Sequence, residues 1–107
     1  MCNQTILELL DSLIELLKKH QVNVWLEHLL DIRNAYHQSL VNARSQDMEI
    51  ALAKLNTLFG GMGSFNDYVI TSLHGDCVNR EEEHIVNQKL NYLRRRLAKA
   101  VRDCSSS

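Results

Sequence analysis

The stretch best suited to chemistry runs from Phe59 to Asp67 and reads F-G-G-M-G-S-F-N-D. Three glycines permit backbone conformations that gather amides into a concave nest, which can hold an anion or a partner's carboxylate. The stretch is not a Walker A loop, because no Gly-Lys-Ser/Thr follows the glycines. It is not a dinucleotide-binding fingerprint either, because a helix and not a strand is expected before it. We favour a tight helix-to-helix connection in which Gly60 is left-handed and Phe65 fills the core. The residues assigned to this structural loop are Gly60, Gly61, Gly63, Ser64, Asn66 and Asp67.

Residue types that can bind a metal, or act as a nucleophile with its base, begin at the last residue of this loop and continue after it. Asp67, His74, Asp76 and Cys77 lie close in sequence, but their spacing matches no standard metal site. A Cys–His pair also needs an orienting group and an oxyanion hole, and nothing in the sequence marks either. The sequence therefore predicts no metal, no cofactor and no catalytic residue, and favours a protein that is not an enzyme.

The longest basic run is Arg94-Arg95-Arg96, followed by Lys99 and Arg102. Consecutive helical residues point about 100° apart, so the three arginines spread around the helix instead of forming one patch. Only one tyrosine lies nearby for stacking on a base. We interpret the run as the solvated end of a helix and expect no direct contact with nucleic acid.

Five carboxylates are placed to form an acidic surface. Glu8, Asp11 and Glu15 recur at three- and four-residue spacing on the first expected helix, and Glu27 and Asp31 repeat the spacing on the second. Nucleases hold nucleic acid with basic sites, so a compact anionic surface suits an inhibitor of such an enzyme. An ordinary hydrated helix face is the simpler interpretation of any single carboxylate. We take these five residues as candidates for binding a partner.

Apolar residues at helical spacing predict four main helices, over about 6–20, 23 to 40–43, 45–59 and from 79 onward. Thr5 and Glu8 have the spacing of a capping box at the first helix, and Asn79 and Glu82 repeat it at the last. The stripes expected in the core are Ile6, Leu9, Leu10, Leu13, Ile14 and Leu17; Trp25, Leu29, Ile32 and Tyr36; Met48, Ala51, Leu52, Leu55, Leu58 and Phe59; and Val86, Leu90, Leu93, Leu97 and Val101.

One segment, Tyr68 to Leu73, is ambiguous. Its β-branched residues suggest a strand, but no partner strand is apparent, so we expect a short buried helix. The predicted fold class is all-α, a single small domain of four main helices with a Gly-rich irregular segment before the last helix. We expect that domain to cover residues 1–104, with a frayed tail at 105–107.

The whole composition fits one helical domain. The chain has 107 residues, no proline, four glycines and a net charge of −1, which argues against a broadly basic surface. No apolar run is long enough to cross a membrane, and no signal peptide is apparent. Cys2, Cys77 and Cys104 are odd in number and form no C-x-x-C pair, which favours the reducing cytoplasm over secretion.

The string F-G-G-M-G-S-F-N-D resembles the signature of a family of small uncharacterised bacterial proteins, and the layout of the helices is similar. That family carries no activity over to this chain. In size and helical style the chain also resembles immunity proteins, which neutralise toxins exchanged between competing bacteria. This resemblance implies a non-enzymatic protein that binds and occludes a toxin domain, such as a nuclease, with no contact to nucleic acid or membrane. The alternative is a structural or regulatory homodimer.

Overall fold

The computed structural model describes residues 2–42, 45–59, 65, 68–71 and 78–105. They form the helices α1 (Cys2–Lys19), α2 (Asn23–Asn42), α3 (Ser45–Asn56) and α4 (Glu83–Ser105), with a short 3-10 helix, η1 (Thr57–Phe59), after α3. No strand occurs among these residues, and the predicted all-α class is confirmed. Helix α4 continues one residue into the predicted tail, and residues 106–107 lie outside the described residues.

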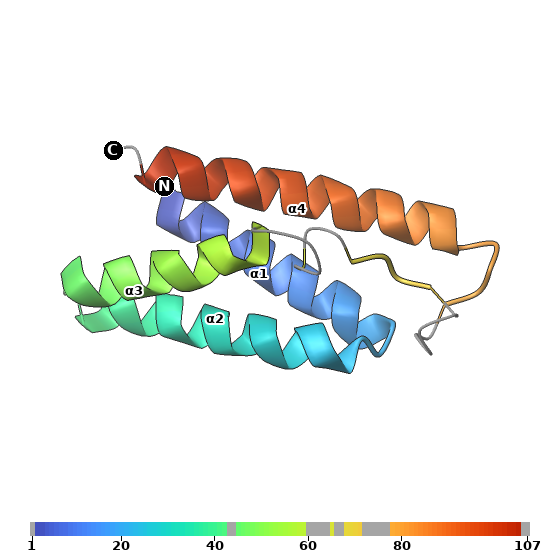
Figure 1. Ribbon diagram of the computed structural model, residues 1–107, viewed down its shortest axis with the longest axis horizontal. Coiled ribbons are helices and arrows are strands. Elements are labelled where there is room, and N and C mark those ends of the chain that lie inside the picture. The colour runs from blue at the N-terminus through green and yellow to red at the C-terminus, as the bar shows by residue number, and fades with distance from the viewer. Residues whose placement is uncertain (1, 43–44, 60–64, 66–67, 72–77, 106–107) are drawn as a thin grey trace.

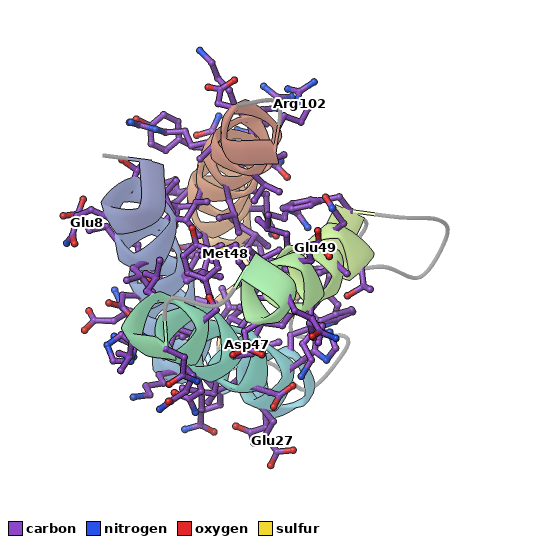
Figure 2. The ribbon with its side chains drawn as sticks, turned by 90° about the vertical axis from the view of Figure 1, so that its left-hand side faces the viewer. Glu8, Glu27, Asp47, Met48, Glu49 and Arg102 are labelled. Carbon is purple, nitrogen blue, oxygen red and sulfur yellow. The ribbon has the colours of Figure 1, made fainter. Side chains whose placement is uncertain are left out.

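The four α-helices form a closed ring around one core. Each runs opposite to the helix before it in the chain (Figure 1). Helix α1 packs against α2 and α4, α2 packs against α3, and α3 packs against α4. Seen from one end, the helices occupy four corners around inward-pointing side chains (Figure 2). The bundle measures 45 × 25 × 21 Å, and closing the ring makes α1 and α4 neighbours although they are far apart in sequence.

The core consists mainly of the apolar stripes that the sequence predicts. In the α3 stripe, however, Met48, Leu52 and Phe59 are only partly buried, and the core also contains Leu16 and Val22, which the predicted stripes do not include. Every expected member on α1 and on α4 is buried, as are Leu29, Ile32 and Tyr36 on α2. Trp25 is partly buried and packs against the same cluster. Burying a large apolar side chain stabilises a protein by roughly 1.5–3 kcal/mol, so these stripes hold the bundle together more than helix propensity does.

Two predicted helix starts are wrong. Helix α1 begins at Cys2, which places Thr5 inside the helix instead of at its cap. The Glu8 carboxylate accepts a hydrogen bond from the side-chain amide of Gln4 at 3.2 Å. Helix α4 begins at Glu83, because residues 80–82 form a turn. In that turn the carbonyl of Asn79 accepts hydrogen bonds from the backbone amides of Glu82 and Glu83, at 2.9 and 3.1 Å.

Helix α1 ends in a Schellman motif. The backbone amide of Val22 donates a hydrogen bond to the carbonyl of Leu17 at 3.0 Å, and the backbone amide of Gln21 donates one to the carbonyl of Lys18 at 3.2 Å. Gln21 has a φ of 55°, the left-handed conformation that this motif requires after the helix. Leu17 and Val22 are both buried, which adds the apolar contact typical of the motif. The sharp reversal lets α2 return alongside α1.

Replacing Gln21 with glycine should raise the free energy of unfolding by about 0.5 kcal/mol or more, because glycine adopts a positive φ without steric cost. Gln38 is the matched control, since it is exposed in the middle of α2. Gln38→Gly should lower stability by about 1 kcal/mol. Urea denaturation measures both variants, and a loss of stability in Gln21→Gly would contradict the assignment of the motif.

Burial of Tyr36 makes stability depend on pH at the alkaline end. Desolvation raises the pKa of its phenol above the ordinary value of 10.0. The folded state therefore holds this proton more tightly than the unfolded state does. The neutral Tyr36 phenol therefore makes its full contribution to the free energy of unfolding below about pH 10. That contribution is lost as the pH rises through the pKa of the phenol in the folded state.

The free energy of unfolding should accordingly fall more steeply above about pH 10 in the wild type than in Tyr36→Phe. Tyr92→Phe serves as the control, because Tyr92 is exposed on α4 and its loss should leave the steep fall in place. Denaturation curves collected across this range test the assignment. Identical pH profiles for the wild type and Tyr36→Phe would contradict it.

Candidate protein-binding surface

The described part of the Gly-rich region is anchored by Phe65, which is fully buried, as predicted. Its ring centroid lies 5.2 Å from that of Trp25 on α2 and 5.6 Å from the guanidinium carbon of Arg94 on α4. Phe65 therefore fastens this region to two helices. The residues assigned to the structural loop lie outside the described residues: Gly60, Gly61, Gly63, Ser64, Asn66 and Asp67.

Arg94 is buried, so the predicted solvation of all three arginines in the basic run is wrong. Only 5% of Arg94 is exposed. One guanidinium nitrogen donates to the carbonyl of Phe65 at 2.6 Å and to that of Tyr68 at 2.7 Å, and the other donates to the side chain of Asn91. The position of Arg94, one turn after Leu90 on the core stripe, is the sequence signal that could have revealed its burial.

The segment 68–71 is irregular, which corrects the predicted helix there, while residues 72–73 lie outside the described residues. The side-chain amide of Asn87 pairs with both backbone groups of Ile70, each at 2.8 Å. The hydroxyl of Thr71 donates to the carboxylate of Glu83 at 3.1 Å. Since α4 satisfies these polar groups with its own side chains, the segment does not need helical hydrogen bonds of its own.

The five candidate carboxylates do not form one compact patch. Asp11 pairs with Arg33 on α2 at 2.8 Å, and Asp31 pairs with Lys54 on α3 at 3.3 Å. These two charges are therefore partly neutralised at the junctions between helices. Glu8 and Glu27 point away from the bundle on different sides, Glu8 from α1 and Glu27 from α2 (Figure 2). The remaining candidate, Glu15, lines a groove.

This groove lies between the second half of α1 and the first half of α4 and has a volume of about 460 Å³. Its apolar lining includes Leu16, Val86 and Leu93, which belong to the buried core. Ile85, at its edge on α4, is 67% exposed, more than any other large apolar side chain among the described residues. The groove therefore combines a mostly apolar floor, which also includes the buried His20, with an apolar side chain exposed to water.

Charged side chains surround this floor. Glu15 and Lys19 line the groove from α1, and Lys89 lines it from α4. All three are exposed, and none forms an ion pair with any described residue. Their charges are thus available to a partner. The sequence pointed to Glu15 but not to Ile85 or Lys89, because the register between α1 and α4 brings these residues together.

The outer face of α4 is basic beyond the groove. Arg95, Arg96, Lys99 and Arg102 are all exposed. Arg96 donates to the hydroxyl of Tyr92 at 2.7 Å, and its guanidinium lies 5.5 Å from the centre of that ring. This arrangement keeps the partly exposed Tyr92 ring beside a cation. The predicted solvation of the basic run holds for Arg95 and Arg96.

Within the described ranges, no three His, Cys, Asp or Glu side chains gather closely enough to hold a metal ion. No helix in those ranges has the length and apolar character needed to cross a membrane. What the described surface offers is a recess with an apolar floor and charged walls, which suits binding to another protein.

Comparison with known proteins identifies a protein family. A family model described as a domain of unknown function (DUF6966) matches residues 18–79. The match includes α2, α3, Trp25 and Phe65, and it ends before α4. Of the residues lining the groove, only Lys19 and His20 fall within it. Neither a curated protein nor a solved structure matches the chain.

Proposed function

The chain belongs to the DUF6966 family of domains of unknown function, and we propose that it is a non-enzymatic immunity protein that binds and occludes a bacterial toxin. The groove between α1 and α4 carries this proposal. Three charged side chains without ion pairs in the described structure, Glu15, Lys19 and Lys89, surround its apolar floor, beside the exposed Ile85. Binding surfaces typically combine an apolar centre with a polar rim in this way.

The proposed mechanism is steric. A toxin domain, such as a nuclease, inserts apolar side chains into the groove, and the bundle then covers its active site. Glu8 and Glu15 attract the basic surface that a nuclease uses to hold nucleic acid. Asp11 and Asp31 contribute less, because Arg33 and Lys54 already oppose their charges. The protein would act in the cytoplasm of the cell that makes it, without touching nucleic acid or membrane itself.

Co-expression with the toxin encoded beside the gene tests the proposal, with growth of the host as the readout. Ile85→Asp places a charge at the edge of the groove and should weaken the complex at least about tenfold, with loss of protection. Val41→Asp on α2 is the matched control, because Val41 and Ile85 have nearly equal exposed fractions of 65% and 67%. Equal protection by both variants would exclude the groove, and failure of the wild type to protect would overturn the immunity function.

A further inference from the structure

The faces of α1 and α4 beside the groove are complementary to each other. Both carry an outward row with the same helical spacing: Glu8, Ser12, Glu15 and Lys19 on α1, and Ile85, Lys89, Tyr92 and Arg96 on α4. We propose that the free protein forms a two-fold dimer through these rows, here called the α1/α4 face. The dimer covers the groove until a toxin displaces the second copy. This last step rests on the proposed function, whereas the dimer itself does not.

The charges of the two rows select the arrangement. The α1 row contains two carboxylates, Glu8 and Glu15, and one cation, Lys19, so its net charge is negative. The α4 row contains the cations Lys89 and Arg96 and no carboxylate, so its net charge is positive. A two-fold axis along the bundle lays α1 of each copy over α4 of the other, so that carboxylates meet cations. An axis across the helices would instead lay α1 over α1. Helices α1 and α4 run in opposite directions (Figure 1). Glu15 and Lys89 line the same groove, so Glu8, seven residues before Glu15, lies toward the half of α4 that holds Arg96, seven residues after Lys89.

The size and apolar content of the face also suit a dimer. The bundle is 45 Å long and 21 to 25 Å wide, so one face is comparable to the roughly 800 Å² that each partner buries in a stable interface. Ile85 and Tyr92, exposed by 67% and 56%, stand in the α4 row and would be covered. The contact is isologous, since the same residues serve both copies, and every charge pair therefore occurs twice.

Sedimentation velocity on the purified chain, over a concentration series at low and high salt, tests the dimer without any toxin. The wild type should dimerise, and more weakly at high salt. Glu15→Lys and Lys89→Glu should each raise the dissociation constant by at least about tenfold, since each places like charges together twice. The double variant Glu15→Lys/Lys89→Glu should regain most of the affinity. Glu27→Lys on α2 is the matched control and should dimerise like the wild type, and circular dichroism confirms that each variant is folded.

Rescue by the double variant supports the dimer, because a merely structural effect of either substitution would accumulate instead. A wild type that stays monomeric throughout, or one whose dimer ignores both single substitutions, overturns the proposal. If the protein is a monomer but still forms an equimolar complex with the neighbouring toxin, the dimer is overturned and the immunity function stands. Conversely, a dimer that protects against no toxin would overturn the immunity function and leave the dimer standing.

Discussion

Replacing Phe65 with alanine should lower the free energy of unfolding by about 4 kcal/mol, the largest effect that we expect of any single substitution. The side chain is fully buried between α2 and α4, and its removal leaves a cavity beside Trp25 and Arg94. Arg94 cannot fill that space easily, because hydrogen bonds to two backbone carbonyls hold its guanidinium in place.

Urea denaturation measures this loss, and the fluorescence of Trp25, the only tryptophan in the chain, reports the change beside it. We expect its emission to shift to longer wavelength as water reaches the ring. Val69→Ala is the control in the same segment, because Val69 is about half exposed, and it should change stability by no more than about 0.5 kcal/mol. A small effect of Phe65→Ala would mean that the core closes without the Gly-rich region.

Arg94→Met should cost about 3 kcal/mol. Methionine fills a similar volume, but it leaves the carbonyl of Tyr68 without the guanidinium and removes the charge beside Phe65. Hydrogen bonds from charged donors contribute about 1.5–3 kcal/mol each, and Arg94→Met removes those to the carbonyls of Phe65 and Tyr68. Arg94→Lys should recover only part of the loss, because one ammonium cannot reach both carbonyls and Asn91 with the geometry of a planar fork.

The neighbouring arginine provides the control for this prediction. Arg95 lies on the exposed face of α4, so Arg95→Met should stay within about 0.5 kcal/mol of the wild type. Denaturation curves of Arg94→Met, Arg94→Lys and Arg95→Met decide the matter together. Equal losses for Arg94→Met and Arg95→Met would show that the run acts through its total charge and not through the buried guanidinium.

Arg94 also shows why sequence reasoning reached the helices but not all of their contacts. The stripes on α1 and α4 follow the period of a helix, which is a local property, so every member predicted for them is buried, although the buried Leu16 on α1 is not among those predicted. A run of three arginines, by contrast, is typical of solvent. Whether one of them turns inward depends on backbone carbonyls brought by a segment far away in sequence, as Phe65 and Tyr68 are here.

The residues of the candidate surface also differ in whether spacing along one helix or packing between helices reveals them. Glu15 could be selected from the spacing of charges on one helix. Its partners in the groove, Ile85 and Lys89, could not be selected, because only the register of α1 against α4 brings them opposite it. The ion pairs of Asp11 with Arg33 and of Asp31 with Lys54 also join different helices, so the sequence could not show that these charges are opposed.

The contact between α1 and α4 also governs when the protein becomes functional during its synthesis. During translation α2, α3 and η1 are synthesised after α1 and before α4. The apolar stripe of α1 packs against both α2 and α4, so it stays partly exposed until α4 has emerged. A nascent chain that stops after η1 should be prone to aggregation and depend on chaperones, because the apolar stripe of α1 is still exposed. The groove needs side chains from both α1 and α4, so it is completed only when α4 docks. Any partner that binds this groove can therefore do so only after α4 has emerged and docked against α1.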